Sequence, residues 1–279
     1  MDLPDSPPAP VVGLLGGMSW HSTAHYYRAV NERVAAARGG HASARLLLAS
    51  LDFAEVRALQ VAGDWAGAGA LLAREAVALE RAGAGCVAIA TNLMHKVAPA
   101  VAAALEVPLV HIADAVAHEA RRAPARAGGA RTLGIVGTRW VMAEPFYAER
   151  LAAHGIRAVA PDAGTQQELD RIVFDELTQG VVTERSRAAF RAAFADLVAA
   201  GADAIVLACT EIMLLVDEGD SAVPLIDSCA AHADALARIA LGERSGEALA
   251  PGAAEGLQHG GDRGDALGAL AVAQGDRAA

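Results

Sequence analysis

The sequence predicts an α/β protein made of two pseudo-symmetric α/β subdomains, each with a parallel sheet, and a functional site at their interface. Two observations support this prediction. Short apolar runs alternate with longer Ala-rich segments of helical length, and this alternation is typical of a mostly parallel sheet. The chain also matches itself at a nearly constant offset, which indicates a duplicated unit.

The predicted elements follow one another along the chain in that alternating order. The apolar runs have the length of buried strands and cover residues 11–15, 45–51, 86–90, 109–111, 132–136, 204–208 and 225–227. The Ala-rich segments between them predict helices over residues 22–37, 64–82, 95–105, 144–154, 183–200 and 229–241. A short helix is also expected to begin directly after Cys209.

The self-match defines the two halves. Residues 82–91 lie over residues 200–209 without a gap, and flanking matches of 13–17 with 134–138 and of 107–110 with 223–226 occur in the same order. Composition alone can make Ala-rich segments resemble one another, but three ordered matches favour a duplication. The predicted domains are 11–120, which carries Thr91, and 131–241, which carries Cys209. Residues 1–10 and 245–279 lack sustained periodicity and are expected to be disordered tails.

Composition excludes several classes of function. The 279 residues carry a net charge of −10 with no basic cluster, which argues against nucleic-acid and membrane partners. No signal peptide is evident, so we expect a cytoplasmic protein. Three scattered cysteines do not form a disulfide framework or a zinc motif. Lys96 is the single lysine and does not lie in a Walker or pyridoxal-phosphate motif, so neither metal nor cofactor is expected.

The predicted topology places the polar segments that follow the strands at one cleft, because ligands bind outside the carboxyl ends of parallel strands. These segments contain residues 16–19, 91–92, 138–139 and 209–211. The self-match makes Thr91 and Cys209 equivalent positions. Two proton-bearing groups across a cleft suit a reaction in which a proton leaves one face of a carbon and another arrives on the opposite face.

Several of these segments together resemble the aspartate/glutamate racemase family. They are residues 13–23 (GLLGGMSWHST), 91–97 (TNLMHKV), 111–115 (HIADA), 137–139 (GTR) and 209–212 (CTEI). The resemblance covers residues 11–240. It implies cofactor-independent racemisation of an acidic amino acid, aspartate or glutamate, by two catalytic residues on opposite sides of the α-carbon. It also implies a homodimer as the assembly to expect.

The resemblance assigns roles residue by residue. Cys209 matches the family's second catalytic cysteine, and Thr91 stands where the first is usual. Leu93 stands where the family has a threonine, so a hydroxyl that could hold a substrate carboxylate is missing. The residues expected to bind the carboxylate or ammonium groups are Met18, Ser19, Asn92, Thr138 and Thr210, with Ser50 and Glu211 as further candidates. Cys86, at the far end of its strand, is expected in the core.

The two catalytic positions are expected to be unequal. The thiol of Cys209 has an ordinary pKa of about 8.5, which a donor or the expected helix start could lower. A threonine hydroxyl is a much poorer base, so we expect one enantiomer to be preferred. By analogy with relatives whose second-half cysteine takes the proton of the L-enantiomer, the resemblance implies a preference for L-substrates. His95 and Lys96 are expected on a helix surface or the cleft rim. Whether His111 with Asp114, and Asp227 with His232, orient the catalytic groups is left open.

Two other functions fit a cleft with a single thiol. A decarboxylase or isomerase of small diacids needs only one protonating group, and it would release carbon dioxide or rearrange its substrate instead of exchanging the α-proton. A catalytically inactive amino-acid-binding protein is the third candidate, because Thr91 and Leu93 replace residues usual in the family. Binding without proton exchange would distinguish it.

Overall fold

The computed structural model describes residues 10–123 and 129–243. The predicted tails, apart from Pro10, lie outside the described residues. The N-terminal half contains β1 (Val12–Gly16), α1 (Trp20–Arg38), β2 (Leu46–Ser50), α2 (Phe53–Ala62), α3 (Trp65–Arg81), β3 (Cys86–Ile89), the 3₁₀ helix η1 (Leu93–Val97), α4 (Ala98–Ala103), β4 (Leu109–Val110) and α5 (Ile112–Arg122).

The C-terminal half contains β5 (Thr132–Gly137), α6 (Arg139–Ala143), α7 (Pro145–Ala152), β6 (Arg157–Val159), α8 (Ala163–Arg171), the π-helix η2 (Ile172–Glu176), η3 (Leu177–Gln179), α9 (Glu184–Ala199), β7 (Ala204–Ala208), η4 (Ile212–Leu214), η5 (Glu218–Asp220), β8 (Leu225–Asp227) and α10 (Ser228–Ala240). No helix in these described ranges is long and apolar enough to cross a bilayer.

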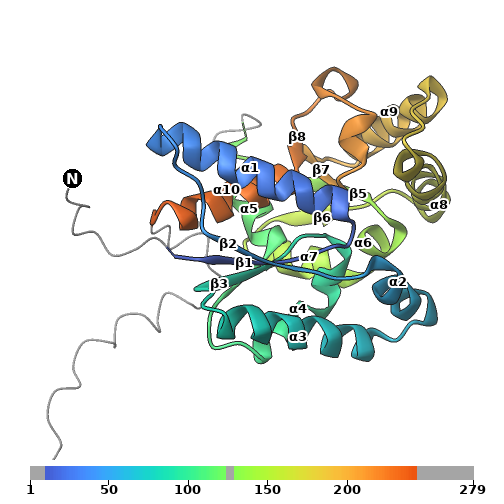
Figure 1. The fold of residues 1–279 in the computed structure, drawn as a ribbon. Coiled ribbons are helices and arrows are strands. Elements are labelled where there is room, and N and C mark those ends of the chain that lie inside the picture. The colour runs from blue at the N-terminus through green and yellow to red at the C-terminus, as the bar shows by residue number, and fades with distance from the viewer. Residues whose placement is uncertain (1–9, 124–128, 244–279) are drawn as a thin grey trace, which may run out of the picture.

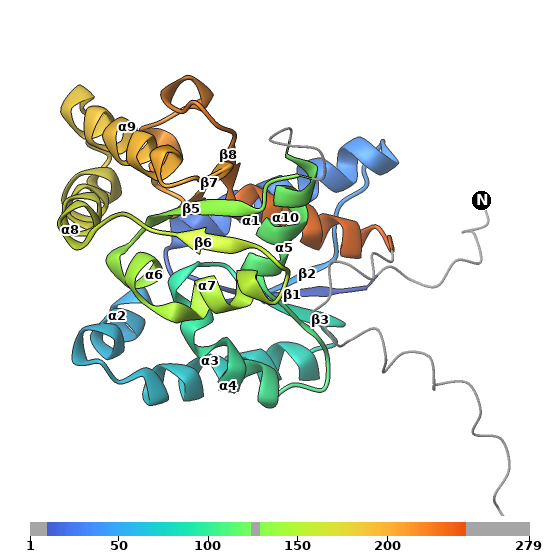
Figure 2. The same ribbon diagram turned by 180° about the vertical axis from the view of Figure 1, so that it is seen from behind.

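The strands form two four-stranded parallel sheets with the same order, β2-β1-β3-β4 and β6-β5-β7-β8 (Figure 1). The central strands are buried on both faces, which explains their continuous apolar sequences. This arrangement confirms the predicted α/β class with two similar parallel sheets. Figure 2 shows the second sheet from behind, with β5 and β6 in front of α10.

Each sheet is covered by helices on both faces. On the first sheet, Leu15 and Ile89 pack under α3 and α4, whereas Leu14 and Ala88 face α1 and α10. On the second sheet, α8 and α9 with η2 cover one face, and α5 and α7 cover the other. Burial on both faces therefore gives the molecule four apolar cores around two sheets.

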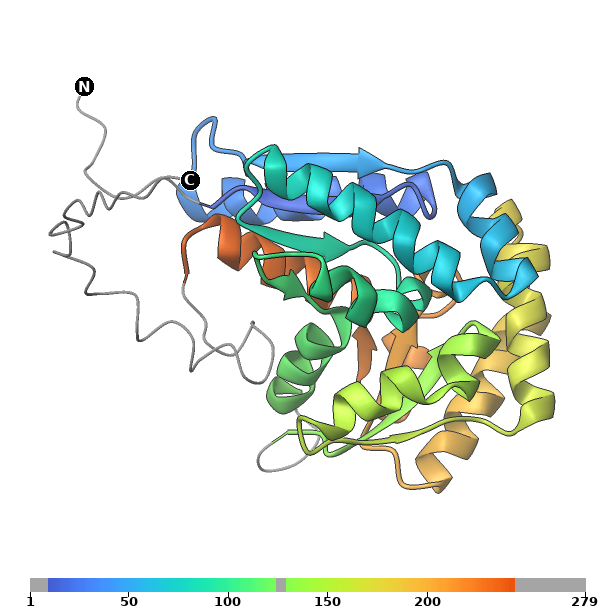
Figure 3. The same cartoon turned by 90° about the horizontal axis from the view of Figure 1, so that it is seen from below.

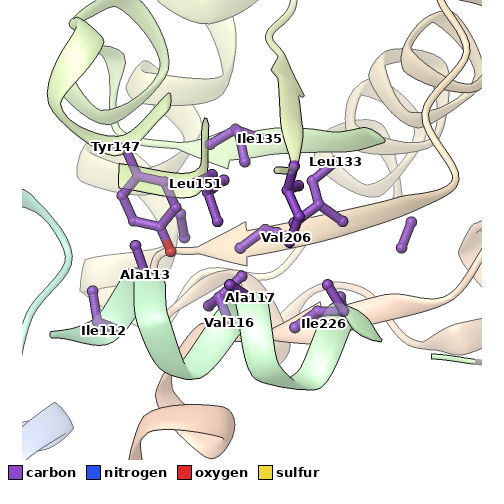
Figure 4. Packing of buried hydrophobic residues seen from close by; sticks show 14 of the residues in the cluster. Ile112, Ala113, Val116, Ala117, Leu133, Ile135, Tyr147, Leu151, Val206 and Ile226 are labelled. Carbon is purple, nitrogen blue, oxygen red and sulfur yellow. The ribbon is translucent and has the colours of Figure 1, made fainter. Parts of the chain in front are cut away.

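Helices α5 and α10 are exchanged between the halves. Helix α5 follows the first sheet in sequence, yet Ile112, Val116 and Ala117 pack against Leu133 and Val206 of the second sheet (Figure 4). Helix α10 follows the second sheet, yet its buried face packs beside α1 and the first sheet. The two helices contact each other between the sheets (Figure 3). The last helix of each predicted half thus belongs to the core of the other.

Some elements differ from the sequence prediction. Strand β6 and helices α2, α5, α6 and α8 lie outside the predicted elements. The predicted helix over residues 95–105 is divided into the 3₁₀ turn η1 and α4, since Pro99 occupies the first turn of a new helix. The prediction that a helix begins directly after Cys209 is also wrong. The backbone there makes i→i+3 hydrogen bonds over the short 3₁₀ turn η4 and does not continue as an α-helix.

Candidate active site

A cavity of about 570 Å³ opens at the carboxyl ends of the strands, between the two sheets. Its lining includes most of the predicted site residues: Met18, Ser19, Thr91, Asn92, Thr138, Cys209, Thr210 and Glu211. Ser50 is the exception, since its side chain is exposed at the end of edge strand β2 and it is not part of the lining. Arg139, beside Thr138, also lies outside the lining.

The topology explains the position of the cavity. In each sheet the chain order reverses between the two central strands, β1 and β3 or β5 and β7, which is where parallel sheets bind ligands. Two glycines allow the strand ends to come close. Gly17 has a φ of +87°, and a Cβ there would lie 2.1 Å from the carbonyl oxygen of Leu51. A Cβ at Gly137 would lie 2.8 Å from the carbonyl oxygen of Ala208, directly before Cys209.

Thr91 and Cys209 occupy equivalent places in the two halves. Each lies just after the third strand of its sheet, β3 or β7, and each lines the cavity. Each is followed within a few residues by a 3₁₀ turn. The duplication therefore brings one hydroxyl and one thiol to the same cavity.

The Cys209 thiol faces a carboxylate. Its Sγ donates to Glu211 Oε2 at 3.1 Å, and the Thr210 hydroxyl donates to the same oxygen at 2.7 Å. Burial and the Glu211 carboxylate raise the pKa of Cys209 well above its ordinary value. The expectation that a helix start lowers this pKa is therefore wrong: no α-helix begins there, and the neighbouring charge is negative. Cys209 rests as a protonated thiol.

Thr210 is committed to this network. Its hydroxyl hydrogen goes to Glu211, and its oxygen lies 2.7 Å from the hydroxyl of Ser22 on α1. A hydroxyl has one hydrogen to donate. In this arrangement the Thr210 hydroxyl therefore holds Glu211 in place and has no hydrogen left for a substrate carboxylate.

Two polar atoms in the cavity wall have no hydrogen-bond partner: Asn92 Oδ1 and Thr138 Oγ1. Both residues are more than nine-tenths buried, with exposed fractions of 5% and 9%. Buried polar atoms are rarely left without a partner, because the desolvation they suffer costs about 1–3 kcal/mol each. These two atoms are consequently the best candidates for direct contact with a bound ligand.

Three buried histidines lie behind the cavity, where the halves meet. The ring of His95 is 4.3 Å from that of His111 and 5.9 Å from that of His232, centroid to centroid. Burial lowers the pKa of His95 to about 3 and that of His232 to about 4. The prediction that His95 lies on a surface or rim is wrong, because it is 1% exposed.

The hydrogen bonds of His95 explain its burial. Its Nε2 accepts from the backbone N–H of Ile112 at 3.1 Å, so Nδ1 carries the hydrogen and donates to the carbonyl of Thr91 at 2.8 Å. The neutral ring thus connects the start of α5 to the backbone at Thr91, just after strand β3. Lys96 bridges the halves too, through an ion pair with Glu144 at 2.6 Å and a position over the Trp65 ring.

Asp114 and His232, whose roles the sequence left open, make hydrogen bonds between elements of the fold. Asp114 on α5 accepts from Arg150 on α7 and from His154, which follows the end of α7. His232 lies between the hydroxyl of Tyr26, at 2.9 Å, and the carbonyl of Val110, at 3.0 Å. These side chains join elements of the two halves and lie outside the cavity lining, except for Tyr26.

One wall of the cavity was not predicted. It is formed by the π-helical segment and its neighbours, with Val173, Phe174 and Leu177 in the lining, and by Gln60 of α2. Arg57 connects these elements, because its guanidinium lies 4.8 Å from the centre of the Phe174 ring and donates to Gln60 at 3.3 Å. A π-helical turn is often found at functional sites, but no pattern in the sequence distinguishes it.

Among the described residues, no group of three or more His, Cys, Asp or Glu side chains is arranged to hold a metal ion. Among the described residues of the lining, Glu211 is the only Asp, Glu, Lys or Arg. The cavity can therefore hold a small polar molecule between a thiol and a hydroxyl, with one negative charge beside the thiol. Such an arrangement can move protons to and from a carbon atom.

The sequence and the fold of the chain are similar to those of known proteins. Residues 15–236 match the family model described as Asp/Glu/Hydantoin racemase. A Yersinia pestis structure assigned as an Asp/Glu racemase is 43% identical, with a TM-score of 0.78 over 83% of this chain and 99% of that one. An aspartate racemase homologue from Pyrococcus horikoshii is 31% identical, with a TM-score of 0.70 and the same coverage. Picrophilus torridus aspartate racemase, at 19% identity and a TM-score of 0.62 over 84% of this chain and 95% of that one, shares the fold.

Proposed function

The chain belongs to the Asp/Glu/hydantoin racemase family, and from this premise we propose that it racemises an acidic amino acid, aspartate or glutamate, without a cofactor. Cys209 and Thr91 are the two groups that exchange protons with the α-carbon. The observation that carries the proposal is their equivalent placement at the ends of β7 and β3, in one cavity.

The resting thiol needs a proton acceptor before its sulfur can act as a base. Glu211 is positioned to be that acceptor, because its Oε2 already takes the S–H hydrogen bond. Transfer of the proton leaves a thiolate beside a neutral carboxyl group, and the thiolate then removes the α-proton. Thr91 delivers a proton to the opposite face while taking one from a cavity water, and Glu211 loses its proton to solvent, which balances the turnover.

The unpartnered atoms of the wall support an orientation for the substrate. Asn92 Oδ1 is an acceptor and suits the α-ammonium group, whereas the Thr138 hydroxyl can donate to the α-carboxylate. Hydrogen bonds to the carboxylate stabilise the negative charge that develops when the α-proton leaves. Met18 and Ser19 complete this side of the cavity.

The two unequal proton-transfer groups should exchange the α-protons of the two enantiomers at different rates. A thiolate is a far better base than a threonine hydroxyl, so the enantiomer whose α-proton faces Cys209 should exchange that proton with solvent faster. We propose that this is the L-enantiomer. The two enantiomers are incubated separately in deuterium oxide. Early loss of the α-proton from added D-enantiomer but not from added L-enantiomer would contradict this assignment.

The test is proton NMR of L- and D-aspartate and of L- and D-glutamate in deuterium oxide. We expect loss of the α-proton signal with the wild-type protein, and a rate at least 10²-fold lower with Cys209→Ala, the usual scale for losing an acid–base group. Cys86→Ala is the matched control, since it removes a buried thiol from the core at the other end of a strand. It should keep the wild-type rate.

Each alternative function has its own outcome in this experiment. Release of carbon dioxide from a malonate-type acid, without exchange of any amino acid, would establish a decarboxylase. Saturable binding of aspartate or glutamate without exchange would establish a binding protein. If none of the four amino acids exchanges, the proposed racemisation is refuted.

A further inference from the structure

Ser228 lies at the point where the two halves meet behind the cavity. It is the first residue of α10, the exchanged helix, and its exposed fraction is 0%. Its hydroxyl donates to the carbonyl of Leu207 at 2.8 Å and accepts from Asn92 Nδ2 at 3.0 Å. Leu207 lies two residues before Cys209, and Asn92 directly follows Thr91. One hydroxyl group therefore links the strand ends that carry the two proton-transfer groups.

The direction of these hydrogen bonds follows from chemistry. A backbone carbonyl can only accept, so the single hydrogen of the Ser228 hydroxyl goes to Leu207. The oxygen of Ser228 can then only accept from Asn92, and the group that faces it must be the NH₂ of the amide. The other end of the amide, Oδ1, is left without a hydrogen-bond partner, and Asn92 is a residue of the cavity lining.

We propose that Ser228 is a positioning residue that fixes the orientation of the Asn92 amide, so that an acceptor rather than a donor faces the amino group of the substrate. The inference rests on the proposed racemase function. It concerns a residue that does not line the cavity and contacts no substrate. Without the hydroxyl, the Asn92 amide can rotate by half a turn and present its NH₂ group to the ammonium ion, which repels it.

The first test compares Ser228→Ala and Ser228→Thr with the wild type. We expect Ser228→Ala to raise KM for the amino acid about tenfold, which corresponds to about 1.4 kcal/mol, with a much smaller change in kcat. Ser228→Thr keeps a hydroxyl and should restore most of the lost affinity. Ser186→Ala, which removes another buried hydroxyl on α9, should lower the urea midpoint without changing KM.

A double-mutant cycle separates orientation from general loss of structure. In Asn92→Asp, both ends of the side chain are oxygens, so the cavity meets an acceptor whichever way the group turns. Ser228→Ala should therefore raise KM about tenfold in the wild-type background and less than twofold in the Asn92→Asp background. Equal effects in both backgrounds would overturn the inference.

A second readout needs no substrate. The side-chain NH₂ of Asn92, identified in ¹⁵N spectra by its loss in Asn92→Asp, should exchange slowly with solvent in the wild type and faster in Ser228→Ala. Unchanged exchange in Ser228→Ala refutes the inference alone, whether or not the amino acid is a substrate. A wild-type protein that exchanges no α-proton refutes the proposed function, and the inference falls with it.

Discussion

Replacing Arg150 by methionine should destabilise the protein strongly, because it leaves a buried carboxylate without its main partner. Asp114 lies on the exchanged helix α5, and its side chain is 1% exposed. Its oxygens accept from Arg150 Nε at 2.7 Å, from Arg150 Nη2 at 2.6 Å and from His154 Nε2 at 2.8 Å. Arg150→Met removes two of these three hydrogen bonds and the formal positive charge that compensates Asp114.

Removing one partner of a buried ion pair costs about 3–5 kcal/mol. We therefore expect the free energy of unfolding, measured with urea, to fall by that amount in Arg150→Met. The control is Arg74→Met, which breaks an ion pair with Glu75 in which the arginine is 68% exposed and should cost less than about 1 kcal/mol. The double variant Asp114→Asn with Arg150→Met should recover part of the loss. A loss below 1 kcal/mol in Arg150→Met would refute the reasoning that this pair anchors α5 to the second half.

Three further predictions concern protons. Glu211→Gln removes the carboxylate that raises the pKa of Cys209, so thiolate absorbance should appear at lower pH than in the wild type; an unchanged titration would count against the Cys209–Glu211 contact. Thr91→Cys should speed deuterium exchange into the D-enantiomer several-fold in the NMR assay but leave it below the rate for the L-enantiomer, and equal rates would show that the carboxylate beside Cys209 is dispensable. Burial lowers the pKa of His95 to about 3 and of His232 to about 4, so below pH 6.5 the unfolded chain binds protons that the folded chain does not. The contribution of these histidines to the free energy of unfolding should be complete above about pH 6.5. Towards pH 4 the free energy of unfolding should fall by up to about 1.4 kcal/mol per pH unit for each histidine. Urea midpoints that stay constant over this range would contradict this prediction.

The sequence predicts the sheets better than it predicts the helices that cover them. Central strands such as β3 and β7 are buried on both faces, so they appear as continuous apolar runs and reveal the duplication. Strand β6 has one exposed and two half-buried residues and leaves no such signal. The exchange of α5 and α10 could not be predicted, because an apolar helix face shows that a helix is buried and does not show which of two equivalent sheets it covers.

The strand-end rule predicts the parts of the site that follow strands directly. It brings Thr91, Thr138 and Cys209 together, since each comes at the end of a central strand. It misses Gln60 and Phe174, which reach the cavity from helical segments distant in sequence. The hydrogen bonds that hold Asn92 and Glu211 cannot be predicted from the sequence either, because they depend on side-chain geometry within a fraction of an ångström.

The duplication explains why two proton-transfer groups meet in one cavity, and the differences between its copies explain why the two enantiomers are expected to exchange their α-protons at different rates. The offset that pairs Thr91 with Cys209 also pairs Leu93 with Glu211. The thiol side therefore has a carboxylate that can take its proton, whereas the hydroxyl side has a buried leucine in the equivalent place. A hydroxyl without a neighbouring base can pass a proton to carbon but is a poor group for removing one. Thr91 and Leu93 both weaken base chemistry on the same side of the cavity. The proposed preference for one enantiomer would therefore come from the two strand ends together and not from Thr91 alone.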